Sequence, residues 1–205
     1  MKKRKYPRQK IIHFLPIITF VFVCSMFSFS SFYTPKWMFK WKGIRKEIKD
    51  SVQKFDRYGE ICFDSTNQFG YKLQNYFTHE WILKNATPSE LYNLLDYPDG
   101  TVKAIAYEGL MYNSKVKKFP LLKRSLNDTL SFVFFSSGCE GTGVMLSDYV
   151  INFIANIGKG VPPRYDYNPP EIKLSEDEKD EILKLFYKRK SKENYYRKEF
   201  YKTLK

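Results

Sequence analysis

Residues 87–110 read TPSELYNLLDYPDGTVKAIAYEGL, and this stretch carries the clearest structural signals in the chain. Thr87 can cap a helix, Pro88 suits the first helical position, and Glu90 completes a capping box. A Pro-Asp-Gly turn follows, and Thr101 can cap the next helix. This pattern predicts two short antiparallel helices joined by a turn. The inner face of the pair is predicted from nonpolar residues at helical spacing: Leu91, Leu94, Leu95, Val102, Ile105, Ala106, Gly109 and Leu110.

The order of these residues resembles a HEAT-type repeat. In that family a leucine-rich helix precedes a short turn with Asp and Pro, and a second helix follows the pattern Val-Arg/Lys-x-x-Ala-x-x-x-Leu, as residues 102–110 do. The resemblance covers residues 87–126, about one repeat period. It implies a non-enzymatic scaffold that binds other proteins. Only one clear repeat is present, so the resemblance implies a compact helical domain and not an extended solenoid.

The segments that flank this pair complete the predicted domain over residues 61–157. Three of them have helical spacing of apolar residues: 64–84, 119–126 and 145–157. One face of the first segment carries Phe69, Leu73, Phe77 and Trp81. The sequence LSFVFF at residues 130–135 is the only stretch that reads as a strand, and residues 136–143 read as a glycine-rich loop. We therefore predict a mainly α fold with at most one short strand.

The N-terminal 33 residues have the pattern of an export leader. Six basic residues and no acidic residue lie in residues 1–10, and residues 11–33 carry no charge. Such a start stays in the cytoplasm while the apolar segment enters the bilayer, so we expect residues 34–205 outside the cytoplasm. Two alternatives remain open. The segment is a retained single-pass anchor, since about 20 residues span a bilayer, or a signal peptide cleaved near Ser30.

A basic amphipathic helix is predicted over residues 34–60. Its apolar residues recur at helical spacing: Trp41, Ile44, Ile48, Val52 and Phe55. We expect this face to pack on the domain behind it. The alternative is that the helix lies on an anionic lipid surface.

The C-terminal region is predicted as a Pro/Gly linker over residues 158–174 and a charged helix over residues 175–205. Acidic residues lie at the start of this helix and basic residues at its end, which suits the helix dipole. Its apolar residues lose their phase near residues 189–193, so we expect the first half to dock and the second half to be exposed. Candidate contacts to an acidic partner or lipid are Tyr195, Tyr196, Arg197, Lys198, Phe200, Tyr201 and Lys202.

Composition and cysteine usage add two expectations. The chain carries a net charge of +13, and the part after the leader carries 29 basic and 22 acidic residues, which favours acidic surfaces. Cys62 and Cys139 remain after the leader, and an even pair outside the cytoplasm is a candidate disulfide. The alternative is two ordinary buried thiols.

No motif with a known chemistry is present in the sequence. His79 is the only histidine after the leader, so no zinc-ligand spacing occurs, and the glycines of 136–143 lack the lysine of a phosphate loop. We predict no catalytic residue, metal or cofactor. The leading hypothesis is a non-enzymatic, membrane-associated or exported helical interaction protein with a protein partner of unknown identity.

Two other functions are alternatives to this hypothesis. An envelope enzyme could use Cys139 as a nucleophile, with His79 as its base. The basic, aromatic-rich ends of the chain would also suit a nucleic-acid binder. Export argues against nucleic acid as a partner, so none is expected.

Overall fold

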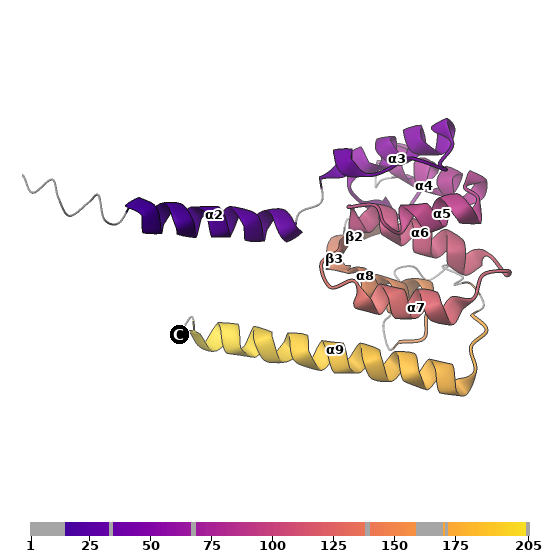
Figure 1. The fold of residues 1–205 in the computed structure, drawn as a ribbon. Coiled ribbons are helices and arrows are strands. Elements are labelled where there is room, and N and C mark those ends of the chain that lie inside the picture. Colours follow the sequence, from indigo (N-terminus) through magenta and orange to yellow (C-terminus); the bar gives the residue numbers. More distant parts are fainter. Residues whose placement is uncertain are drawn as a thin grey trace, which may run out of the picture. The chain divides into compact units, whose positions relative to one another are not determined.

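A computed structural model describes most of the chain (Figure 1). The described residues are 15–32, 35–66, 69–137, 140–158, 170 and 172–203. The chain divides into two compact units, Met1–Met38 and Phe39–Lys205. The basic start of the leader and most of the predicted linker lie outside the described residues.

The first unit contains helix α2 (Leu15–Phe32) and the short 3-10 helix η1 (Lys36–Met38). Large apolar side chains of α2 are exposed, including Ile18, Phe20 and Phe22. Among the residues that the structure describes, no helix combines the length and the hydrophobicity that crossing a membrane requires.

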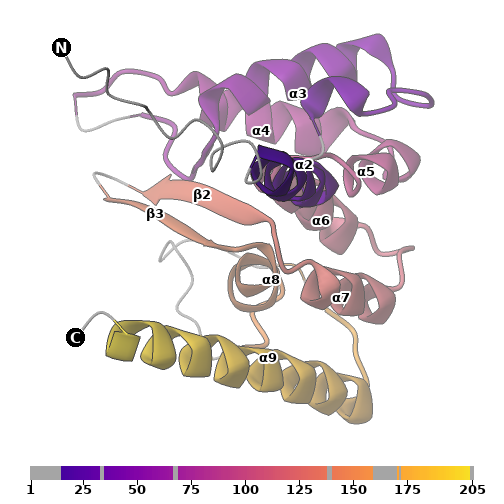
Figure 2. The same ribbon diagram turned by 60° about the vertical axis from the view of Figure 1, so that its left-hand side comes forward.

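The second unit is mainly helical, as predicted, and contains a small sheet (Figure 2). Its helices are α3 (Lys46–Tyr58), α4 (Gln74–Asn85), α5 (Pro88–Leu94), α6 (Gly100–Tyr112), α7 (Lys118–Asn127), α8 (Leu146–Asp148), the π-helical η2 (Tyr149–Ile154) and α9 (Glu176–Thr203). Its strands are β1 (Ile61–Cys62), β2 (Phe132–Ser137) and β3 (Glu140–Met145). Figures 1 and 2 show α3 and α4 at one end of the unit, α9 at the other end and α6 between them.

The predicted helical pair is present as α5 and α6, which pack against each other. The capping box forms as expected, because the Glu90 N–H donates to Thr87 Oγ1 and the Thr87 N–H donates to the Glu90 carboxylate. The cap of α6 differs from the prediction: Asp99 accepts hydrogen bonds from the N–H groups of Thr101 and Val102. An aspartate caps at least as well as a threonine, and it lies one residue before the start of the helix.

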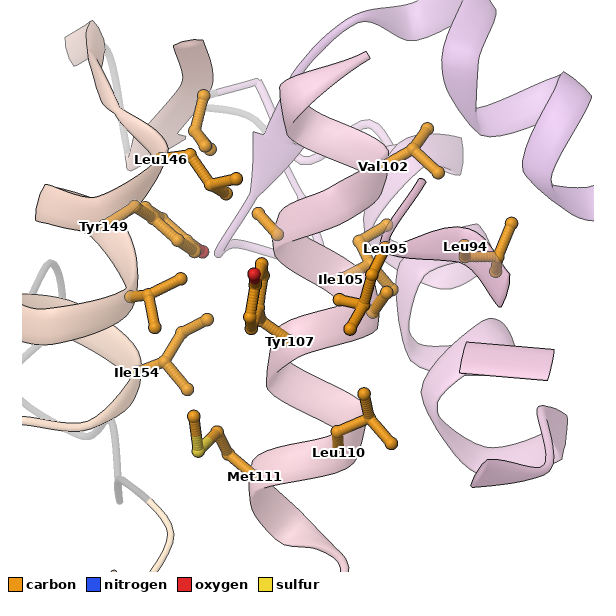
Figure 3. Packing of buried hydrophobic residues seen from close by; sticks show 14 of the residues in the cluster. Leu94, Leu95, Val102, Ile105, Tyr107, Leu110, Met111, Leu146, Tyr149 and Ile154 are labelled. Atoms are coloured by element: carbon orange, nitrogen blue, oxygen red, sulfur yellow. The ribbon is translucent and has the colours of Figure 1, made fainter. Parts of the chain in front are cut away.

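Helix α6 is the centre of the core. It contacts α3, α4, α5, β2, α8 and η2, which explains why almost every side of it is apolar or small. The predicted inner-face residues Leu91, Leu94, Val102 and Leu110 are all buried. Figure 3 shows Tyr107 of α6 among the buried side chains that lie between α6 and η2, with Tyr149 of η2 on the other side.

The sheet corrects the prediction for residues 136–143. The described residues of this stretch are strand, because β2 continues to Ser137 and β3 begins at Glu140. Strand β2 pairs antiparallel with β3 and parallel with β1, giving the order β1-β2-β3 in the described sheet. One strand was predicted because the glycines of β3 are poor strand formers on their own, and pairing with β2 overrides that preference.

The sheet lies close to the start of α6. A Cβ atom at Gly100 would lie 2.2 Å from the Phe132 carbonyl oxygen, so only glycine allows this approach. The Thr101 hydroxyl lies 3.4 Å from the Phe134 N–H, from which it accepts a hydrogen bond. These contacts fix β2 against the central helix and determine which of its faces points outward.

Two flanking helices differ from their predicted forms. Helix α3 begins at Lys46, later than predicted, and buries Ile48, Val52 and Phe55, which confirms that this face packs on the domain. Helix α4 begins only at Gln74. The aromatic face predicted for residues 64–84 is largely exposed to solvent: Phe77 and Trp81 on α4 are exposed, and so is Phe69, which precedes the helix. The buried face of α4 instead carries Asn75, Thr78, His79 and Ile82.

Candidate functional site

The outer face of the β2–β3 hairpin exposes a row of large apolar side chains. We call Leu130, Phe132 and Phe134 the hairpin face; their exposed fractions are 64%, 53% and 55%. Val133 and Phe135 point the other way and are buried, as strand alternation requires. Isolated exposed apolar residues are ordinary. Here two exposed phenylalanines share one face of β2 and an exposed leucine directly precedes the strand, and such a group marks a surface suited to binding another molecule.

Glycine in β3 makes room for this face. Gly143 lies opposite Phe134 in the antiparallel register. A Cβ atom at Gly143 would lie 2.9 Å from the Phe134 ring, so this ring lies directly over the glycine. Gly143, which the sequence analysis placed in a loop, therefore has a packing role on the strand.

Strand β3 is also the outer strand of the described sheet. Within the part of the chain that the structure describes, its far side has no neighbouring strand. Such an edge presents backbone N–H and C=O groups to which an extended segment of another chain can add. The hairpin thus offers a backbone edge and an apolar face together.

A buried ion pair lies inside the domain, between α4 and α6. His79 Nε2 lies 2.9 Å from Glu108 Oε2, and both side chains are almost fully buried. Burial alone would lower the pKa of His79, but the Glu108 carboxylate outweighs it and raises that pKa; Glu80 adds to the effect. The Glu108 carboxylate therefore favours the protonated imidazole, which is enclosed by the core with the Phe55 ring nearby.

We expect this pair to make stability depend on pH. Because the pKa of His79 is raised on folding, its contribution is complete below about pH 6.5 and is lost as the pH rises through the folded value. Unfolding by urea should show the free energy of unfolding falling above that pH, by at most about 1.4 kcal/mol per pH unit for one proton. The double variant His79→Leu/Glu108→Leu should lack this fall. A wild-type protein with constant stability from about pH 6 to about pH 9 would contradict the assignment.

Cys62 lies in β1 and is buried. Its sulfur lies 3.2 Å from the Ser136 hydroxyl and accepts a hydrogen bond from the Asn75 amide. Burial raises the pKa of this thiol, so Cys62 is protonated at neutral pH and is a poor nucleophile. Cys139 lies outside the described residues. The Cys62–Cys139 disulfide and the nucleophilic role of Cys139 both stay predictions.

Helix α9 docks by its first half, as expected. Ile182 and Phe186 are buried against the domain, and Asp148 forms ion pairs with Arg189 and Lys190. The candidate contact residues from Tyr195 to Lys202 lie on the same helix, but their side chains are outside the described part of the structure. Their role in binding an acidic partner or lipid stays a prediction.

Comparison of the chain with protein-family models, curated proteins and solved structures finds no match. Among the described residues, no group of three or more His, Cys, Asp or Glu side chains is placed to hold a metal ion.

The sequence did not point to the hairpin face. LSFVFF is apolar at nearly every position, so its exposed and buried faces could not be told apart. The signal that was available is Gly143, because a glycine within a strand leaves space on one strand face for a large side chain opposite it.

Proposed function

We propose that this chain is a non-enzymatic, membrane-associated or exported helical interaction protein whose partner binds the hairpin face. The observation that carries the proposal is the outward row of Leu130, Phe132 and Phe134 beside an edge strand. Water contact with this much apolar surface is unfavourable, and a partner that covers it removes that cost.

The leader supports the membrane or export part of the proposal. Basic residues precede a segment without charge in the sequence, and the apolar side chains of α2 are exposed along the described part of that helix. This order is typical of segments that enter a bilayer, whether they are retained or cleaved.

The helical core supports the scaffold part of the proposal. The α5–α6 pair corresponds to the segment that resembles a HEAT repeat, a family of interaction scaffolds. The large apolar residues of its inner face are buried. In this proposal the core holds the hairpin rigidly in place, and the hairpin contacts the partner.

The proposal predicts position-specific contacts in the cell. A photo-crosslinking amino acid at position 132 or 134 should give a discrete adduct heavier than the chain itself. With the crosslinker at position 130, the otherwise wild-type chain should give this adduct, and the variant Phe132→Ser/Phe134→Ser should not. Its free energy of unfolding should change by less than about 1 kcal/mol, because both side chains are exposed.

A matched control uses two aromatic residues that are exposed elsewhere on the domain. Tyr58 and Tyr92 are each 41% exposed, and Tyr58→Ser/Tyr92→Ser should leave the adduct intact. If positions 132 and 134 give no adduct, or if both double variants abolish it equally, the hairpin face is not the binding surface.

A further inference from the structure

A pocket of about 440 Å³ lies between the end of α6 and the start of α7. Its lining includes Lys117, Lys118 and Lys173, with Tyr112 and Met111 among its other residues. No acidic side chain belongs to its described lining. The described lining is therefore concave and basic, and it is separate from the hairpin face.

Lys118 is the unusual member of this group. Its side chain is only 8% exposed, and its ammonium donates to the backbone carbonyl oxygens of Leu110 and Asn113. No carboxylate pairs with it among the described residues, and burial lowers its pKa. An ammonium has three hydrogens, so one remains for a further acceptor. A buried charge without a counter-ion is unfavourable, and an anion in the pocket would relieve it.

The start of α7 adds positive potential at the same place. Lys117 is the N-cap of this helix but provides no side-chain capping hydrogen bond, and Pro120 in the first turn has no N–H. The side chain of Lys117 therefore does not cap the backbone N–H groups of Lys118 and Phe119. The exposed N-terminal end of a helix favours anions, above all phosphate groups.

We propose that this pocket binds a phosphate-bearing ligand. Three lysines and a helix N-terminus suit a small anion with more than one negative charge, and lysine is a common point-charge partner of phosphate. The hydrogen bonds from Lys118 to carbonyl groups at the end of α6 explain why Lys118 itself is buried here. They give no reason for Lys117 and Lys173 to line the same pocket. Tyr112 and Met111 provide an apolar wall for the organic part of such a ligand.

The test measures binding of radiolabelled pyrophosphate to the full chain in detergent by equilibrium dialysis. Lys117→Ala/Lys173→Ala should weaken binding by about tenfold or more, because both lysines line the pocket and each removes one positive charge from it. Both residues are exposed, so the fold should be retained. Lys115→Ala/Lys184→Ala removes two exposed lysines outside the pocket lining and should change affinity by no more than about twofold.

Competition separates the two sources of the phosphate group. Displacement of the probe by glycerol phosphate in solution indicates a soluble ligand, and displacement only by phosphatidic acid in mixed micelles indicates a lipid headgroup; either result supports the proposal. The absence of saturable pyrophosphate binding would overturn it. An equal loss of affinity in the two double variants would also overturn it, because attraction would then follow net charge and not this pocket.

Discussion

The Glu90→Gln variant is expected to lose about 2–3 kcal/mol of folding free energy at neutral pH. The Glu90 side chain is almost fully buried and accepts hydrogen bonds from the Arg45 guanidinium, the Arg45 backbone N–H and Thr87. It therefore joins the start of α3 to the start of α5. A glutamine keeps the size but loses the charge that strengthens these bonds. Because the Arg45 side chain is partly exposed, solvent screens its attraction to Glu90 and limits the loss of stability.

The same residue predicts a specific sensitivity to acid. Hydrogen bonding from Arg45, followed by the contribution of Thr87, lowers the pKa of Glu90 to about 2 despite its burial. Since the folded value is depressed, the stability contribution is complete above about pH 4.5 and is lost as the pH falls toward about 2. The wild-type protein should lose stability through this range in urea titrations, and Glu90→Gln should lose markedly less.

Glu178 provides the matched control for this prediction. It completes the other capping box, in which Ser175 and Glu178 exchange the same two hydrogen bonds at the start of α9. No arginine bonds to it among the described residues, and it is more exposed than Glu90. Glu178→Gln should cost less than about 1 kcal/mol, which is the usual value of a cap. An equal cost of both variants would show that the Arg45 contact contributes nothing beyond capping.

The two capping boxes also show what the sequence could predict. The box at Thr87 and Glu90 was readable because its partners lie three residues apart, and the sequence has the same spacing at Ser175 and Glu178. The helices that follow both boxes are present. The contact between Glu90 and Arg45 spans 45 residues along the chain, and no local pattern encodes it. The pair His79–Glu108 is of the same kind, since neither residue is marked by its neighbours in sequence.

Strand β3 and helix α4 show where local reasoning fails. The glycines of β3 predict a loop on their own, but pairing with β2 satisfies their backbone groups in a sheet. In α4 the aromatic residues form the more apolar face, yet the helix buries Asn75 and His79 because their partners lie on β1 and α6. Tertiary hydrogen bonds therefore outweigh the hydrophobic pattern at this helix.

The largest loss of stability is expected from Leu94→Ala. Leu94 is 1% exposed and lies with Val52, Ile82 and Ile105 around a small internal void that is too small for water. Truncation would enlarge this void between α3, α4, α5 and α6, at a cost of about 2–5 kcal/mol. Thermal and urea unfolding should show the loss directly. An unchanged melting temperature would mean that the inner face of the α5–α6 pair is wrongly assigned.

Leu130→Ala makes the identical chemical change at a position that is 64% exposed. It should alter the free energy of unfolding by less than about 0.5 kcal/mol, yet it removes part of the hairpin face and should weaken partner crosslinking at position 134. Leu94→Ala should lower the free energy of unfolding but leave partner crosslinking unchanged while the domain stays folded, since no part of the hairpin face is changed. The two leucines therefore separate folding from binding. If Leu130→Ala destabilised the domain as strongly as Leu94→Ala, that surface would belong to the core and could not serve as the binding face.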